Sequence, residues 1–255
     1  MALLETQAVS KRFGGLEAVA GLTLAVEAGT ITGLIGPNGA GKTTVVNLIT
    51  GLLQATSGRI LFKGEDITAL PANAVARRGV ARTFQNIRLL KEASVLDNIV
   101  VGYHVRETTS LLDNLLGLPA ARRERREFVG RARELIERFR MERYADHLAG
   151  SLSYGHQRRV EIMRALAMEP ALLLLDEPVA GMNDVEAEAL GRIFRDLAAG
   201  GLAILLIEHN MRFVMSHCAQ IYVVNVGRLI ASGTPQAVSE DPTVIAAYLG
   251  EAAGA

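Results

Sequence analysis

The sequence is poor in cysteine and in long apolar runs, and neither charge is in excess. The single cysteine, Cys218, cannot form an internal disulfide, which is typical of a protein from a reducing compartment. The longest apolar stretches, residues 171–175 and 202–207, are far shorter than the ~20 residues that span a bilayer. We therefore expect no transmembrane helix.

Charge and the first residues exclude further classes. Lysine plus arginine and aspartate plus glutamate both number 27, so no global charge attracts nucleic acid or an anionic membrane. The N-terminal residues lack a basic region followed by a long apolar core and a cleavage site, so we expect no secretion signal. The sequence predicts a cytosolic chain without a nucleic-acid partner.

A glycine-rich segment follows the apolar run 31–35 and precedes the apolar stretch 45–49, an order that predicts a strand, a turn and a helix start. Its residues are Gly36, Pro37, Asn38, Gly39, Ala40, Gly41, Lys42, Thr43 and Thr44. Glycines let backbone N–H groups approach a phosphate, and the helix start adds its positive dipole end. We expect Lys42 to reach the β- and γ-phosphates of a nucleotide and the Thr43 hydroxyl to bind Mg²⁺.

The remaining chain alternates strands and helices. We expect strands near the N-terminus at residues 3–9, 18–26 and 59–62. Together they would form an antiparallel element. Later strands are expected at 171–176, 202–207 and 221–226, and helices at 155–168, 185–198 and 210–216. This alternation predicts an α/β fold with a parallel sheet. We expect a single domain, 1–255, whose nucleotide-binding core (1–93 and 149–255) carries a helical insertion, 94–148.

Two adjacent carboxylates, Asp176 and Glu177, lie between the apolar run 171–175 and Pro178. Functional groups in open α/β sheets lie at the carboxyl ends of strands, where this pair falls. We expect Asp176 to hold Mg²⁺ and Glu177 to act as the general base that activates the attacking water. By itself such a pair is as often a helix cap or a turn, and it is the phosphate loop that favours the functional interpretation.

The segment Leu152-Ser153-Tyr154-Gly155-His156-Gln157 precedes an amphipathic helix. Alone, Ser153 would be interpreted as a helix cap. A phosphate loop, this LSxGxQ-like segment and the Asp-Glu strand, in that order, resemble an ABC transporter ATPase subunit over essentially the whole chain. The resemblance implies the P-loop NTPase ABC-type ATPase core with an antiparallel β subdomain and an inserted α-helical subdomain.

The resemblance also implies a head-to-tail dimer in which ATP lies between the phosphate loop of one subunit and the signature segment of the other. Ser153 and Gly155 would contact the partner's ATP. Tyr154 and His156 depart from the commonest signature residues, glycine and glutamine, whereas Gln157 follows the pattern.

Four further positions match functional positions of this family. Gln85 matches the glutamine that senses Mg²⁺ and the attacking water, and His209 matches the switch histidine that contacts the γ-phosphate. Phe13 matches the aromatic residue that stacks on adenine, although the alternative of a core or turn phenylalanine stays open. Asn183 occupies the loop position where most relatives carry aspartate and contact the dimer partner.

The amino-acid sequences of several segments, among them 82–89, 153–159 and 222–225, resemble the larger ATPase of branched-chain amino acid importers. This implies ATP and Mg²⁺ as cofactors, a second, shorter ATPase, integral membrane permease subunits and, indirectly, an extracytoplasmic solute-binding protein. The chain would act at the cytoplasmic face of the cell membrane. Urea or amide importers, lipopolysaccharide exporters and soluble ABC ATPases remain alternatives.

Residues 122–143 contain nine arginines and five glutamates, many of them three or four positions apart. We interpret this segment as a solvated helix face with intrahelical ion pairs, rather than as a site for nucleic acid or lipid.

Overall fold

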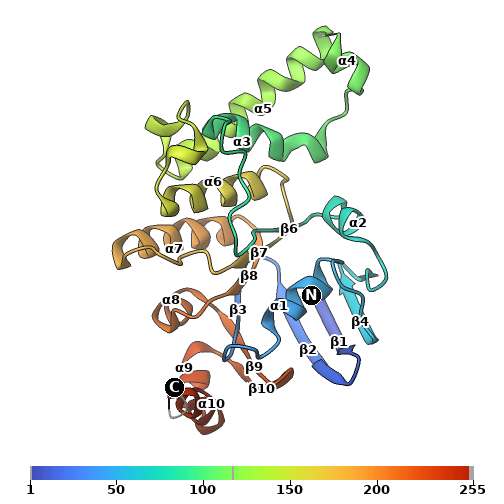
Figure 1. Cartoon of the computed structure of the whole chain (residues 1–255), viewed down its shortest axis with the longest axis vertical. Helices are drawn as coiled ribbons and strands as arrows, with labels where there is room; N and C mark the ends of the chain where they lie inside the picture. Colours follow the sequence, from blue (N-terminus) through green and yellow to red (C-terminus); the bar gives the residue numbers. More distant parts are fainter. Residues whose placement is uncertain (1, 117, 253–255) are drawn as a thin grey trace. The chain divides into compact units, whose positions relative to one another are not determined.

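The computed structural model describes residues 2–116 and 118–252, which form two compact units (Figure 1). The first unit runs to Arg82 and also contains Ala171–Val179 and the chain from Asp184 onward. The second unit comprises Thr83–Pro170 and Ala180–Asn183. The expected insertion, 94–148, lies inside the second unit, which begins earlier and ends later.

An antiparallel sheet forms one part of the first unit, and its strands alternate buried and exposed side chains. Its strand order is β2 (Leu16–Glu27), β1 (Ala2–Phe13), β4 (Ser57–Phe62) and β5 (Glu65–Asp66). Gly14 adopts a φ of 57° in the turn between β1 and β2, a conformation that suits glycine. The antiparallel element predicted from the sequence is therefore present, with longer strands than expected.

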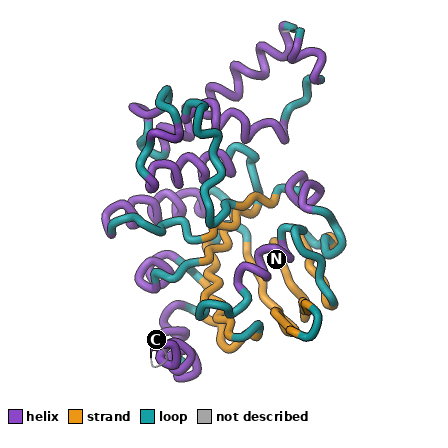
Figure 2. Tube along the Cα trace, viewed as in Figure 1, coloured by secondary structure: helices purple, strands orange, loops and turns teal. Residues whose placement is uncertain are grey.

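A six-stranded sheet forms the centre of the first unit (Figure 2). Its order is β10 (Arg228–Gly233), β9 (Gln220–Asn225), β3 (Ile31–Ile35), β8 (Ala203–Ile207), β7 (Leu172–Asp176) and β6 (Val80–Arg82). All strands pair in parallel except β10, which returns antiparallel to β9. Every residue of β3, β7 and β8 is buried, as expected for strands that are covered on both faces.

Helices complete the first unit, and the two longest of those described are α7 and α10. In chain order they are α1 (Lys42–Ile49), α2 (Ala72–Arg77), α7 (Asp184–Ala199), α8 (Met211–His217), α9 (Pro235–Glu240) and α10 (Pro242–Ala252). The sequence reasoning predicted α7 and α8 but neither α2 nor the C-terminal pair. It also missed β6 and β10.

The described residues of the second unit are helical, with no strand among them, as expected for the insertion. Its helices are α3 (Val95–Gly102), η1 (Tyr103–Arg106), α4 (Leu111–Leu115), α5 (Pro119–Arg138), η2 (Glu142–Tyr144), η3 (Ala149–Ser151) and α6 (Tyr154–Leu166). Phe128, Ala132 and Ile136 form the buried face of α5, and the Phe128 ring stacks on Tyr103 at 5.0 Å between centroids. Among the described residues, no helix combines the length and apolar character needed to cross a membrane.

Candidate functional site

Three neighbouring strands of the parallel sheet carry the main predicted site residues. β3, β8 and β7 lie side by side, and their register pairs Leu34 with Ile207 and Ile207 with Asp176. The segments that follow these strands therefore leave the sheet at one edge. The phosphate loop, His209 and the Asp176–Glu177 pair come together there, although they are far apart in the sequence.

The backbone of the phosphate loop is held in conformations that suit glycine. Gly36 has a φ of 152°, and a Cβ atom there would lie 1.9 Å from the Val224 carbonyl oxygen. Gly41 has a φ of 101° directly before α1, whose first turn has no side-chain cap and no acidic residue. Since no side chain caps them, the first N–H groups of α1 fit an anion.

The Lys42 ammonium group is buried within the loop. Its Nζ atom donates to the carbonyl oxygens of Gly36 at 2.7 Å and Pro37 at 2.9 Å. These contacts hold a positive charge beside the N-terminus of α1. Together the lysine and the helix N-terminus have the chemistry that a phosphate group needs.

Asp176, at the end of β7, is buried and pairs with Arg82, which was not predicted as a site residue. Arg82, at the end of the neighbouring strand β6, approaches the Asp176 carboxylate at 3.2 Å and also donates to the side chain of Asn47. A carboxylate oxygen is a ligand that Mg²⁺ accepts, and Arg82 fixes the position of that carboxylate. The signal for Arg82 was its place at the carboxyl end of a strand.

Glu177 and His209 lie in direct contact. The Glu177 Oε1 atom lies 3.1 Å from His209 Nε2, and both side chains are accessible to solvent. Glu177 has a φ of 50°, a conformation that is uncommon for a non-glycine residue, and its N–H donates to Ile207 at 2.8 Å. This backbone turn directs the carboxylate toward the histidine, so the pair can hold and orient a water molecule.

Glu208 is a buried carboxylate that the sequence reasoning did not identify. Oε1 accepts a hydrogen bond from the N–H of Val179 at 3.0 Å, and Oε2 accepts from the N–H groups of His209 and Asn210 at 3.0 and 3.2 Å. Burial raises the pKa of Glu208 above its usual value, and these three hydrogen bonds offset part of that shift. One side chain thus connects the segment after Glu177 to the segment that carries His209.

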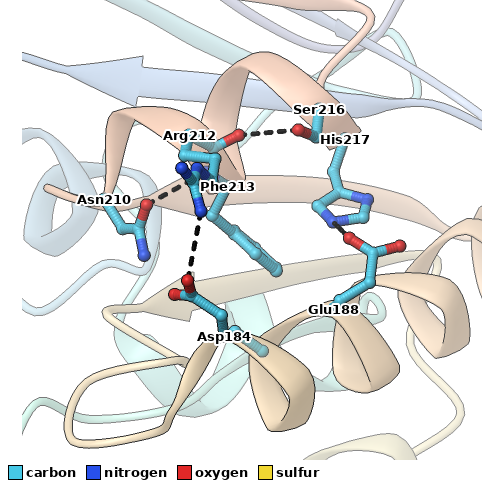
Figure 3. Close-up of a pocket in the computed structure, with 8 residues that line it drawn as sticks. Asp184, Glu188, Asn210, Arg212, Phe213, Ser216 and His217 are labelled. Atoms are coloured by element: carbon cyan, nitrogen blue, oxygen red, sulfur yellow. Dashed lines mark hydrogen bonds and ion pairs between the residues drawn. The ribbon is translucent and has the colours of Figure 1, made fainter.

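A pocket lies between α7 and α8 of the first unit (Figure 3). It is lined by Asp184, Ala187, Glu188, Asn210, Arg212, Phe213, Ser216 and His217, none of which was predicted as a site residue. Arg212 pairs with Asp184 at 3.1 Å, and His217 lies 3.2 Å from the Glu188 carboxylate. These contacts join the two helices.

In the second unit, the signature segment forms the N-terminus of α6. Ser153 occupies the cap position, yet its hydroxyl contacts the His156 ring at 2.8 Å instead of capping the helix. Gln157 donates to the Leu152 carbonyl at 2.8 Å. Because no side chain caps α6 and no acidic residue lies in its first turn, its N-terminus also fits an anion.

The two departures from the commonest signature sequence make specific contacts. The Tyr154 hydroxyl accepts a hydrogen bond from Arg158 at 3.0 Å, and the His156 ring lies 4.5 Å from the Tyr144 ring. A Cβ atom on Gly155 would make ordinary contact with Met182, so the 180–183 loop lies against the signature segment.

Arg158 and Glu161 form a fully buried ion pair on α6, with 2.8 Å between Nη1 and Oε2. Arg158 donates to the carbonyl oxygens of Phe84 and, at 2.8 Å, Gln85, and the Glu161 carboxylate accepts from the N–H of Phe84 at 3.4 Å. The pair thereby holds the backbone that carries Gln85. The sequence reasoning missed this pair; its signal was the spacing of three between opposite charges in an otherwise apolar helix face.

Three further predicted residues have no tested role. Phe13 ends β1 with 46% of its surface exposed, and the Lys11 ammonium lies 5.1 Å from the ring centroid. An exposed ring of this kind is available for stacking. Gln85 and Asn183 belong to the second unit, and their roles at Mg²⁺ and at the dimer partner stay predictions.

Two family models match the chain. One, described as ABC transporter, covers residues 19–180. The other, described as branched-chain amino acid ATP-binding cassette transporter, covers residues 228–254. The first includes the phosphate loop, the signature segment and Glu177, and the second includes β10 and the C-terminal helices.

Similar proteins cover nearly the whole chain. It is 45% identical to the high-affinity branched-chain amino acid transport ATP-binding protein BraF of Pseudomonas aeruginosa and 44% identical to LivG of Escherichia coli, which carries the same description. It is 39% identical to LptB, the lipopolysaccharide export system ATP-binding protein of Escherichia coli. Each alignment spans 98% of both chains.

Solved structures agree with these relatives. A nucleotide-free ATP-binding cassette from an ABC transporter is 35% identical, with a TM-score of 0.85 over 97% of this chain and 99% of that one. An ATP-binding cassette in its ADP conformation is 34% identical, with a TM-score of 0.85 over 98% and 99% of the two chains.

Proposed function

Because the chain belongs to the family of ABC transporter ATPases, we propose that it hydrolyses ATP to drive the uptake of branched-chain amino acids through partner membrane subunits. The relatives at 44–45% identity carry branched-chain amino acid transport in their descriptions, and the match over residues 228–254 adds a second, independent indication. ATP binding would close a pair of ATPase subunits and hydrolysis would reopen them.

The contact between Glu177 and His209 is the observation that supports hydrolysis most directly. In this proposal Glu177 takes a proton from the attacking water, while His209 orients the carboxylate and donates to the γ-phosphate. Lys42 and the first N–H groups of α1 hold the phosphates, and Phe13 stacks on the adenine.

Mg²⁺ would be held by Thr43 and Asp176, with Gln85 completing the set. Among the described residues, no group of three or more His, Cys, Asp or Glu side chains could hold a metal ion. Mg²⁺ typically binds to one or two protein oxygens, substrate phosphates and water. The bound ion would neutralise charge on the β- and γ-phosphates.

The partners follow from the same proposal. Ser153, Gly155 and the N-terminus of α6 would contact the ATP held by a second ATPase subunit, arranged head-to-tail, and Asn183 would contact that subunit as well. The assembly would join integral membrane permease subunits at the cytoplasmic face of the cell membrane and receive solute from an extracytoplasmic binding protein.

Uptake of labelled leucine by cells that lack this chain tests the proposed cargo. We expect uptake to be lost, restored by the wild-type gene and not restored by Lys42→Ala, which removes a phosphate contact. Purification from native membranes should recover permease subunits with the chain. Normal leucine uptake despite recovered permeases would contradict the cargo and favour amides, urea or lipopolysaccharide; absence of any membrane partner would contradict transport itself.

A further inference from the structure

Four large apolar side chains are exposed at one end of the second unit, where Figure 1 shows α4 beside the start of α5. Leu112, Leu115 and Leu116 are 69%, 82% and 69% exposed, and Leu118, just before α5, is 41% exposed. The spacing of three and four along α4 places the first three on one helix face. Exposed leucines scattered singly need no explanation, but a cluster of this kind indicates an interaction surface.

Four arginines adjoin these leucines in the first turns of α5: Arg122, Arg123, Arg125 and Arg126. All four are exposed, and in the described part of the chain none forms an ion pair with a carboxylate. The expected intrahelical pairing occurs later in the helix, where Arg131 approaches Glu127 at 3.9 Å. The interpretation of residues 122–143 as a face of intrahelical ion pairs therefore fails for these four.

The carboxylates near the four arginines are engaged by other groups. Glu124 accepts hydrogen bonds from the hydroxyl groups and the N–H groups of Thr108 and Thr109, which lower its pKa to about 2. Asp113 accepts from the N–H and the hydroxyl of Ser110. Residues 110–126 contain four arginines and these two carboxylates, a net charge of +2 within a chain of net charge zero.

One of the leucines, Leu118, also shares a side of α5 with the arginines. Leu118, Arg122 and Arg125 are four and three residues apart, so they lie on one helix face, with Arg126 beside them. We define the α4–α5 tip as Leu112, Leu115, Leu116, Leu118, Arg122, Arg123, Arg125 and Arg126. Arg126 donates to the carbonyl oxygen of Arg122 at 3.3 Å. The tip therefore combines an apolar end with guanidinium groups that form no ion pair with a carboxylate in the described part of the chain.

We propose that the α4–α5 tip binds the surface of a bilayer that contains anionic phospholipids. The leucines would enter the boundary between headgroups and acyl chains, and the guanidinium groups would bind lipid phosphates, which they match in geometry and charge. A second copy of the chain would bring two tips of like charge together, which disfavours self-association. Direct lipid binding goes beyond the proposed transport function, since it needs no permease.

Flotation of the purified full chain with permease-free vesicles tests the proposal. We expect binding to vesicles of phosphatidylglycerol and phosphatidylcholine but not to phosphatidylcholine alone. Changing all four tip arginines to Gln should lower the partition coefficient at least about tenfold, because each basic residue near an anionic surface contributes to binding. A second variant changes Leu112, Leu115 and Leu116 to Ser. Its partition coefficient should fall by a similar factor, because charge cannot replace the lost apolar contact.

A matched control removes the same charge elsewhere in the second unit. Arg133, Arg138, Arg140 and Arg143 are also exposed, and changing them to Gln should alter the partition coefficient less than about twofold. ATPase activity without vesicles, equal in all variants, verifies folding. The proposal is overturned if the wild-type chain does not bind, if both arginine sets weaken binding equally, or if the leucine variant instead abolishes self-association of the chain.

Discussion

Glu208 shows how one buried side chain can position two predicted site residues, Glu177 and His209. Its two carboxylate oxygens accept three backbone N–H groups, from Val179, His209 and Asn210. Because Glu177 lies two residues before Val179, the same carboxylate fixes the segments on both sides of the contact between Glu177 and His209. Glu208 acts as a positioning residue for the proposed base.

Glu208→Gln should slow hydrolysis without weakening nucleotide binding. The amide keeps one acceptor oxygen but turns its NH₂ group toward backbone N–H groups, which costs about 1–3 kcal/mol for the donors left unsatisfied. We expect kcat to fall while KM for ATP stays near its wild-type value, since the phosphate loop is untouched. Glu65→Gln, at an exposed ion pair, is the control and should change neither value. A raised KM with normal kcat would contradict the positioning role.

Cys218 is predicted to be inert toward thiol reagents in the folded chain. It is 7% exposed, and its sulfur lies so close to Gly33 of β3 that a Cβ atom there would be 3.1 Å away. Burial raises the pKa of its thiol to about 12. Since the thiolate is the reactive form, modification at neutral pH should be much slower than for the denatured chain. Labelling followed by mass spectrometry measures both rates, and equal rates would show that the thiol is accessible.

At the scale of elements, α6 does more than present the signature segment. Its first turns carry Arg158 and Glu161, which bind the backbone of Phe84 and Gln85 within the second unit. The predicted Mg²⁺-sensing residue and the predicted contact to the partner's ATP are therefore attached to the same helix. A displacement of α6 would carry both with it.

Two variants separate the contribution of this ion pair to stability from its role in holding the backbone of Gln85. One carries Arg158→Met, and the other carries both Arg158→Met and Glu161→Leu. The single change leaves a buried carboxylate unpaired and should lower the free energy of unfolding by about 3–5 kcal/mol. The double change removes both charges and should recover much of that loss. Chemical unfolding measures the stability of both variants. We expect the double variant to hydrolyse ATP more slowly even so, because the backbone of Gln85 is no longer held; a wild-type rate would contradict this.

Sequence patterns predicted the elements whose signal is local. The apolar run before Asp176 and the glycines around Lys42 each specify a strand end or a turn within a few residues. β6 and β10 were missed because the first has three residues and the second is only partly buried, so neither shows a clear apolar run or alternation. Arg82 was missed because Asp176 is remote in sequence and becomes its neighbour only through the sheet register. Glu208 was missed because its contact with Val179, which links it to the segment after Glu177, is also remote in sequence.

At the scale of the whole molecule, both units contribute predicted site residues. The first unit holds the phosphate loop, Asp176, Glu177 and His209, and the second holds Gln85 and the signature segment. The roles assigned to the second unit depend on a partner chain and on family resemblance. No pattern in a single sequence shows which residues contact a partner chain. The chemistry of the first unit, in contrast, could be inferred from residue types and strand ends.

His217 should make the stability of the folded chain fall in mild acid. Its Nδ1 contacts the Arg195 guanidinium, which can only donate, so the ring is neutral with its proton on Nε2, the atom that lies 3.2 Å from the Glu188 carboxylate. Burial lowers its pKa below the usual 6.5, and Arg195 lowers it further. Above the unfolded pKa both states are neutral; as pH falls below it, the unfolded state binds the proton first and stability decreases.

His217→Gln provides the comparison, because the amide can accept from Arg195 and donate to Glu188 without titrating. Urea midpoints measured from about pH 7.5 to about pH 5.5 should fall more for the wild-type chain than for this variant. Parallel midpoints across that range would contradict the assignment of a neutral buried ring.

The central claim is that Glu177 activates water for ATP hydrolysis in a transport complex. The most direct measurement is ATP turnover by the reconstituted complex with wild-type chain and with Glu177→Gln, alongside nucleotide binding by both. Glutamine keeps the shape but cannot take the proton, so turnover should fall at least about 100-fold while ATP is still bound and closed dimers persist. Unchanged turnover with the variant would contradict the claim.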